Sequence, residues 1–162
     1  MINFVVVDDF IENPHLYLSN VLSGEFTDIT VGDQTFKNIM PLPNDDVFCK
    51  NLISMLEENK YEVAYNFIRR SPLNQDEPNF IHTDDMMGSV TAILYLSVDH
   101  PDDDGTTLYD DDYKKMATFY SKFNRALLFD SRIPHSRNIF QNFGDGDTAR
   151  LIQVAFLKIK GS

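Results

Sequence analysis

The stretch "YEVAYNFIRR" at residues 61–70 decides the fold, because the spacing of apolar residues changes at this point in the chain. From here on, apolar and polar residues alternate in short runs, which turn-forming clusters such as "VDHPDDDG" (98–105) and "NFGDGDT" (142–148) separate. Alternation with a period of two is typical of strands that bury one face. The pattern predicts strands over residues 61–70, 80–84, 89–97, 106–110, 124–130 and 149–160.

The first 60 residues follow a different pattern. "NFVVVDDF" (3–10) is rich in β-branched residues and predicts a strand. "NPHLYLSNVLS" (13–23) predicts a helix with Asn13 as N-cap and Pro14 as first helical residue, and residues 44–60 predict a second helix. Residues 25–44 predict loops with at most one short strand. The order of elements predicts a mainly β domain of the α+β class, an antiparallel sandwich or barrel with helices packed on one side.

The composition is that of a globular protein, with 43% hydrophobic residues and a net charge of −11. This charge disfavours nucleic acid and anionic membrane surfaces as partners, because both are negatively charged. Cys49 is the only cysteine, so no disulfide forms within the chain. No apolar run predicts a membrane helix, and the N-terminus lacks the basic region of a signal peptide. We expect a single cytoplasmic domain over residues 1–162, and the sequence does not indicate its oligomeric state.

A histidine and an aspartate stand two positions apart in "FIHTDDMMG" (80–88). If this segment is a strand, His82 and Asp84 point to the same face. An imidazole beside a carboxylate offers the nitrogen and oxygen ligands that iron(II) accepts. The same residues also fit a polar turn, so the motif alone does not decide between a metal site and a loop.

A third metal ligand has to come from elsewhere in the chain, and His135 is the strongest candidate. It follows "NRALLFDSRIP" (124–134), which predicts a buried strand. His15 lies in a predicted helix and His100 in an acidic turn, where we expect exposure to solvent. A buried structural histidine is the alternative interpretation of His135.

Two polar residues lie on predicted strand faces that are otherwise apolar. Arg150 shares its face of the last strand with Ile152, Val154 and Phe156. A buried guanidinium requires an anion, which either a protein carboxylate or a ligand supplies. Tyr95 ends an apolar strand and either brings its hydroxyl into the same interior or packs as a core aromatic residue with its hydroxyl at the rim.

In chain order, "HTD" (82–84), "TAILYLS" (91–97), "GTTLYD" (105–110), "NRALLFDSRIPHS" (124–136) and Arg150 resemble the Fe(II)- and 2-oxoglutarate-dependent dioxygenases, nearest to their prolyl 4-hydroxylase-like branch. The resemblance implies a double-stranded β-helix, a jelly-roll and cupin-like barrel, over residues 61–160, with a helical support region over residues 1–60. It implies that His82, Asp84 and His135 bind iron(II) and form the catalytic centre. It also implies that Arg150 binds the distal carboxylate of 2-oxoglutarate and that Tyr95 assists.

The reaction that the resemblance implies uses 2-oxoglutarate and O2 and releases succinate and CO2. It hydroxylates a C–H bond of a protein or peptide side chain, or of a small molecule. Loops over residues 25–44, 69–79 and 110–120 are expected at the barrel mouth, where they select the substrate. Within them, Arg69 and Arg70 are expected to be solvated and paired with acidic residues, with recognition of an acidic substrate as the alternative.

The chain departs from the family pattern in three ways. The interval between His135 and Arg150 is longer than usual, Ile152 replaces a polar residue, and Arg137 is a rival for the role of Arg150. Two other functions stay open. One is a cupin-like metalloenzyme that does not use 2-oxoglutarate, and the other is a non-enzymatic jelly-roll binding module.

Overall fold

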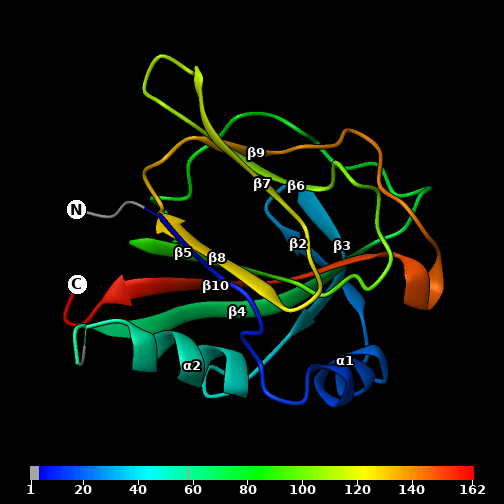
Figure 1. The fold of residues 1–162 in the computed structure, drawn as a ribbon, viewed down its shortest axis with the longest axis horizontal. Coiled ribbons are helices and arrows are strands. Elements are labelled where there is room, and N and C mark those ends of the chain that lie inside the picture. The colour runs from blue at the N-terminus through cyan, green and yellow to red at the C-terminus, as the bar shows by residue number, and fades with distance from the viewer. Residues whose placement is uncertain (1–3, 58) are drawn as a thin grey trace.

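Residues 4–57 and 59–162 are described by the computed structural model, in which two β-sheets face each other and two α-helices lie beneath the larger sheet (Figure 1). The larger sheet has the strand order β1 (Phe4–Val7), β8 (Arg125–Asp130), β5 (Val90–Tyr95), β10 (Arg150–Ile159), β4 (Tyr61–Ser71), β3 (Gln34–Pro41), β2 (Thr27–Val31). The smaller sheet has the order β7 (Lys115–Tyr120), β6 (Gly105–Tyr109), β9 (His135–Arg137). Neighbouring strands are antiparallel throughout both sheets.

The outer face of the larger sheet packs against the helices α1 (Pro14–Leu22) and α2 (Val47–Met55). Phe48 and Leu52 of α2 are fully buried in one cluster with Leu94 and Leu157 of the sheet. The helix begins at Asp46, whose side chain accepts a hydrogen bond from the backbone N–H of Cys49 at 3.0 Å, as an N-cap does. Among the described residues, no helix is long and apolar enough to cross a membrane.

The inner face of the larger sheet points toward the smaller sheet and is built in rows that cross β8, β5, β10 and β4. Directly paired residues of antiparallel strands share a face, so each row follows from the strand register. The first row, called here the aromatic row, contains Phe129, Thr91, Phe156 and Tyr65. The second, aliphatic row contains Leu127, Ile93, Val154 and Phe67. The third row contains Arg125, Tyr95, Ile152 and Arg69, and beyond it Arg150 pairs with Ser71.

A β-bulge in β4 lets this strand serve both faces of the sheet. Tyr65 pairs with Phe156 and Val63 pairs with Leu157, so Ala64 is the extra residue. The bulge changes the alternation of side chains, so that Tyr65 lies in the aromatic row whereas Val63 packs against the core under the helices. Without it, one of the two residues would point to the opposite face.

The sequence predicted the strands β1, β4, β5, β6, β8 and β10 and both helices. The second helix was expected over residues 44–60, but α2 ends at Met55. Residues 3 and 58 of these predicted elements lie outside the described residues. Proline is the first residue of α1, as predicted, but Asn13 makes no side-chain capping bond. The hairpin of β2 and β3 was missed, because its largely exposed strands carry little apolar alternation. The region over residues 1–60 is therefore not only helical, since it adds three strands to the larger sheet.

Two further predictions of local structure were wrong. Residues 110–120 were expected as a loop, but they include β7, an edge strand whose side chains are mostly exposed. Residues 80–84 were expected as a strand, but only an isolated bridge between His82 and His135 forms. The chain leaves the extended conformation at once, because Asp84 begins a turn closed by the bond from Met87 N–H to its carbonyl at 2.8 Å.

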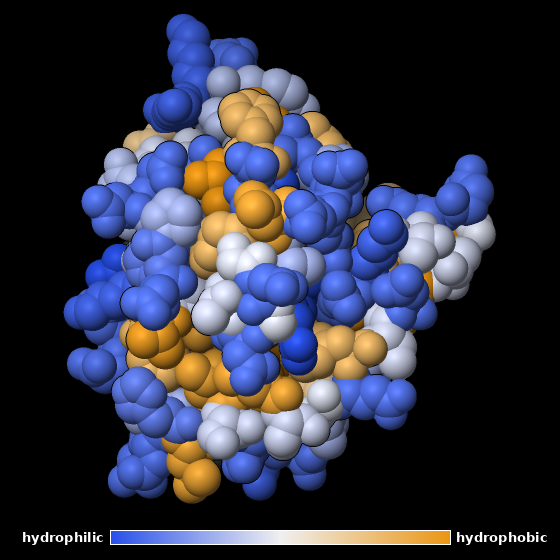
Figure 2. All heavy atoms as spheres, turned by 90° about the vertical axis from the view of Figure 1, so that its right-hand side faces the viewer, coloured by the Kyte–Doolittle hydropathy of each residue, from blue (hydrophilic) through white to orange (hydrophobic). Residues whose placement is uncertain are grey.

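The face of the molecule shown in Figure 2 is mostly hydrophilic, and hydrophobic residues reach the surface in patches between the polar ones. Acidic residues outnumber basic ones by 25 to 14 in the chain, so the exterior repels anions. Several of the few arginines turn inward instead, and they are part of the site described next.

Candidate metal centre

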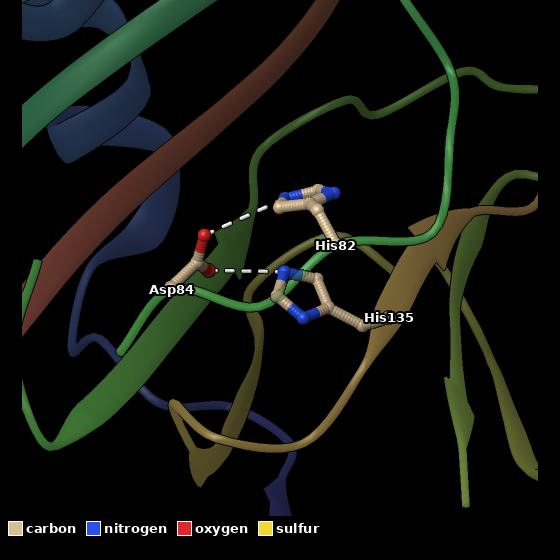
Figure 3. A group of neighbouring side chains, drawn as sticks. All are labelled: His82, Asp84 and His135. Carbon is tan, nitrogen blue, oxygen red and sulfur yellow. Dashed lines mark ion pairs between the residues drawn. The ribbon is translucent and has the colours of Figure 1, made fainter. Parts of the chain in front are cut away.

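His82, Asp84 and His135 meet between the two sheets, although 53 positions of sequence separate the two histidines. Their potential ligand atoms all lie within 4.8 Å of one another. Asp84 stands between the imidazoles: its Oδ2 is 2.9 Å from Nε2 of His135, and its Oδ1 is 3.4 Å from Nε2 of His82 (Figure 3). Two imidazoles and one carboxylate in this arrangement match the facial set of ligands found around non-haem iron(II).

Backbone pairing brings the three residues together. His82 and His135 exchange both backbone hydrogen bonds, at 3.0 and 2.9 Å, and the N–H of Asp84 donates to the carbonyl of Ser131 at 2.8 Å. The segment that carries His82 and Asp84 is thereby fixed along β9 and the turn that precedes it. The site does not need a regular strand at residues 80–84, because these bonds set the direction of both side chains.

Both imidazoles have the same tautomer, set by the backbone. Nδ1 of His82 lies 3.0 Å from the carbonyl oxygen of Phe80, and Nδ1 of His135 lies 3.0 Å from that of Ile133. A carbonyl oxygen only accepts, so each Nδ1 carries a proton. Nε2 faces Asp84 in each case. It donates to the carboxylate when the ring is protonated, and it is free to bind a metal when the ring is neutral. A carbonyl partner of this kind orients a metal-binding histidine.

The charge of Asp84 is stabilised by its surroundings. Burial opposes its ionisation, but the hydrogen bonds with His135 and His82 outweigh burial and hold the pKa of Asp84 well below its usual range. Conversely, the hydrogen bond with Asp84 raises the pKa of His82. The hydroxyl of Thr91 also donates to Oδ2 of Asp84 at 3.3 Å and lies 2.9 Å from the hydroxyl of Ser131. Asp84 is therefore an anion that is available to a cation.

Arg150 lies in the interior, and the anion that it meets is Asp104. Nε of Arg150 donates to Oδ1 of Asp104 at 2.9 Å, and the two side chains are 3% and 1% exposed. Of the two alternatives that the sequence left open, the structure contains the protein carboxylate. The two terminal nitrogens of the Arg150 guanidinium make no hydrogen bond to any described residue, since only Nε is used.

Tyr95 is buried in the third row, beside Arg150 and Asp104. Its hydroxyl forms a 2.6 Å hydrogen bond with the hydroxyl of Thr106 in β6, across the space between the two sheets. Burial raises the pKa of Tyr95 to about 12, so its phenol is neutral at ordinary pH. Tyr95 is thus a buried residue whose hydroxyl has a hydrogen-bond partner, and it lies beside the charged pair of Arg150 and Asp104.

Two more arginines, Arg69 and Arg137, lie near Arg150. Nε of Arg69 is 2.7 Å from Oε1 of Glu77, and Nη1 of Arg137 donates to Oδ1 of Asn142 at 2.6 Å and lies 3.8 Å from Oε2 of Glu77. Arg69 was expected to pair with an acidic residue in solvent. The pair exists, but the Glu77 side chain is only 4% exposed. Arg70 stacks on the ring of Phe26 at 3.9 Å.

Three guanidinium groups and two carboxylates form a cluster with an excess of one positive charge, called here the arginine cluster. Its members are Arg69, Arg137, Arg150, Glu77 and Asp104. Burial lowers the pKa of Arg69 and of Arg137, and repulsion from Arg150 acts on both in the same direction. Burial opposes the ionisation of Glu77, but its arginine neighbours and hydrogen bonds hold its pKa below the ordinary value. A cavity of about 510 Å³ borders the cluster, lined by Leu73, Glu77, Phe140 and Asn142 among others.

Sequence reasoning missed Asp104 and Glu77. Asp104 lies in an acidic turn, and nothing in the run of residues 102–104 distinguishes the one buried carboxylate from its exposed neighbours. The only usable signal was Arg150 itself, since a buried guanidinium calls for a carboxylate. Glu77 lies in a segment rich in proline and acidic residues that resembles an ordinary surface loop.

Comparisons with known proteins identify the fold. No family model matches the chain, and no curated protein matches its sequence. A 2OG-Fe(II) oxygenase family oxidoreductase from Burkholderia pseudomallei has a TM-score of 0.69 at 11% identity, over 96% of this chain and 85% of that one. HygX from Streptomyces hygroscopicus, solved with nickel and 2-oxoglutarate bound, has a TM-score of 0.65 at 11% identity, over 98% and 83%.

A prolyl hydroxylase from Trichoplax adhaerens, solved with a fragment of a hypoxia-inducible factor peptide, has a TM-score of 0.62 at 18% identity, over 96% of this chain and 83% of that one. At such identities the likeness concerns the fold. The predicted fold class is therefore confirmed: the chain is mainly β and has the double-stranded β-helix of 2-oxoglutarate oxygenase structures.

Proposed function

We propose that the protein is an Fe(II)- and 2-oxoglutarate-dependent oxygenase whose iron is held by His82, Asp84 and His135. The observation that carries this proposal is the convergence of two imidazoles and a carboxylate, whose potential ligand atoms lie within 4.8 Å of one another, inside a fold shared with such enzymes. Prolyl hydroxylase-like hydroxylation of a C–H bond in a protein or peptide side chain, or in a small molecule, is the reaction that we favour.

The three residues fit iron(II) in ligand type and in protonation. Their nitrogen and oxygen donors suit this ion, and the backbone carbonyls fix each imidazole with Nε2 toward Asp84. One carboxylate would leave a bound divalent ion with one net positive charge, which an anionic ligand could neutralise. With three protein ligands, a bound iron(II) would also be able to take a cosubstrate and O2.

The charges of the interior support a dianion as the second ligand. The arginine cluster has one positive charge in excess, and the metal with Asp84 would have another. Together they match the two negative charges of 2-oxoglutarate. An unneutralised charge of this kind is costly in a buried site, so a ligand of opposite charge stabilises it.

Arg150 is the arginine best placed to hold the distal carboxylate. Its terminal nitrogens have no hydrogen-bond partner among the described residues, whereas Nη1 and Nη2 of Arg137 donate to Asn142 and to the carbonyl of Phe140. In this proposal Asp104 keeps the guanidinium in place through Nε, and the free side of the fork binds the carboxylate in a bidentate manner. Tyr95, held by Thr106, lies beside it and limits the space available to the cosubstrate.

When iron(II), 2-oxoglutarate and O2 are bound, the metal centre supplies oxidative decarboxylation to succinate and CO2 and the oxidation of a substrate C–H bond. The protein's residues bind and orient the reactants. The aromatic and aliphatic rows surround the reacting atoms with mostly apolar side chains, and no protein acid or base is needed to transfer a proton. Phe129 packs edge-on against His135 at 4.7 Å and so helps to hold this imidazole in place.

Anaerobic titration with Fe(II) and 2-oxoglutarate tests the proposal, because the ternary complex gives a visible charge-transfer band. We expect the band in the wild-type protein, and its loss or strong weakening in His135→Ala and in Arg150→Ala. Arg132→Ala is the matched control, since this arginine is 76% exposed and Asp130 is the one described residue with which it forms an ion pair. If Arg150→Ala leaves the affinity for 2-oxoglutarate intact, Arg150 is not the anchor, and Arg137 takes its place.

One observation favours a second candidate, a cupin-like metalloenzyme without 2-oxoglutarate. Asp104 already neutralises Arg150, so this arginine does not require a ligand. Such a protein would bind the metal at the same three residues but would show no charge-transfer band and no release of succinate from 2-oxoglutarate. A binding module without enzymatic activity would not take up Fe(II) at all.

A further inference from the structure

The aromatic row runs from the candidate metal ligands to the surface. Phe129, at its inner end, packs against His135, and Thr91, next in the row, donates a hydrogen bond to Asp84. Phe156 follows in β10 and Tyr65 in β4. The row therefore starts at two of the three metal ligands and crosses the sheet without a break.

Exposure along the row rises away from the metal ligands. Phe129 is 2% exposed, Thr91 1% and Phe156 6%, whereas Tyr65 at the outer end is 52% exposed. Tyr65 lies edge-on to Phe156, with ring centroids 6.3 Å apart and planes at 83°. The ring of Phe67, in the neighbouring aliphatic row, is also 6.3 Å from that of Phe156. These three rings are called here the aromatic platform, and Tyr65 is its solvent-exposed member.

The platform offers no charged partner to a charged ligand. Neither of the first two rows contains a charged residue, and the arginines lie farther along the sheet. A charged group bound on these rings would lose its hydration without gaining an ion-pair partner, which is costly. A neutral apolar group does not meet this penalty.

We infer that the substrate of this centre has an uncharged planar ring, which binds on Tyr65 and Phe156 with the oxidisable C–H bond toward the metal. The inference rests on the proposed function, since it takes the metal as the reacting centre. The aromatic ring of such a substrate can stack on the exposed Tyr65 ring while the edge of the substrate ring contacts Phe156. Offset stacking and edge-to-face contact are the favoured geometries of aromatic pairs. The bulge at Ala64 is what places the Tyr65 ring on this face of the sheet.

Paramagnetic relaxation tests this inference without turnover. The probe is 2-naphthol, a neutral planar compound, and the metal is Mn(II), whose binding is measured separately by the loss of its free EPR signal. We expect Mn(II)-loaded protein to broaden the naphthol proton resonances. Tyr65→Ser should weaken naphthol binding about tenfold, which corresponds to about 1.4 kcal/mol, while Mn(II) affinity stays unchanged.

Tyr120→Ser is the matched control, because Tyr120 is also 52% exposed on a strand but lies at the end of β7 in the smaller sheet. It should leave the broadening unchanged. Equal losses in the two variants, or no broadening when Mn(II) is bound, would overturn the inference and leave the proposed metal site standing. Failure of Mn(II) to bind would overturn both. Equal binding of 2-naphthalenesulfonate or of naphthalen-2-ylmethylammonium would contradict the uncharged character of the site.

Discussion

The ion pair of Asp104 and Arg150 gives the sharpest prediction about stability. Replacing Asp104 by Asn keeps the shape of the side chain and an oxygen that can accept from Nε of Arg150, but removes the negative charge. The side chain of Arg150 is 3% exposed, so water solvates the remaining charge only poorly. We expect the free energy of unfolding to fall by about 3–5 kcal/mol, as when one partner of a buried pair is removed.

The measurement is urea unfolding at pH 7, with Asp130→Asn as the matched control. Asp130 pairs with Arg132 at 2.7 Å, but Arg132 is 76% exposed, so that variant should lose less than about 1 kcal/mol. For a domain of this size, the loss in Asp104→Asn corresponds to a decrease in melting temperature on the order of 10 °C. Equal small losses in both variants would refute the reasoning, because they would mean that Arg150 reaches solvent or another anion.

Three further outcomes follow from the structure. Metal affinity, measured by calorimetric titration, should fall as pH decreases from 8 to 6, by about tenfold per pH unit for each proton displaced. The reason is that metal binding requires neutral imidazoles and that the pKa of His82 is raised. A metal affinity that does not change over this pH range would exclude the histidines as ligands. Glu77→Gln should lower the free energy of unfolding by about 3 kcal/mol at pH 7 but by much less near pH 3. A carboxyl group with a lowered pKa stabilises the fold at pH values above its unfolded pKa, and this stabilisation is lost as pH falls. A decrease in stability that does not depend on pH would contradict the role of the Glu77 charge. Gly105→Ala should destabilise the protein by more than about 2 kcal/mol, because the backbone has a positive φ of 152° and the new Cβ would lie 1.9 Å from the carbonyl oxygen of Phe119, whereas Gly32→Ala, with open space around it, should cost less.

The barrel could be predicted from the sequence where strands bury a face. In β5, β8 and β10 the core imposes an apolar pattern, and those strands were found. The edge strands β2 and β7 and the hairpin partner β3 bury little, so their sequences are under no such constraint. Their positions depend on backbone pairing with neighbours, which alternation of residue types does not encode.

The site was predictable in part for a similar reason. The spacing of His82 and Asp84 and the position of His135 after a core strand were visible in the sequence, and the fold places these residues together. The partners Asp104, Glu77 and Thr106 were not visible, because each lies in a segment with many similar residues and only tertiary contacts select among them. Whether Arg150 and Tyr95 act on a cosubstrate stays a prediction.

The most direct test of the central claim is a crystal structure of the protein with zinc as a redox-stable stand-in for iron(II), with the metal located by anomalous scattering. We expect one ion bound by Nε2 of His82, Nε2 of His135 and a carboxylate oxygen of Asp84, each at about 2.0–2.2 Å. The Nδ1 atoms should keep their bonds to the carbonyls of Phe80 and Ile133. An ion bound elsewhere, or two imidazoles that bind different ions, would contradict the central claim.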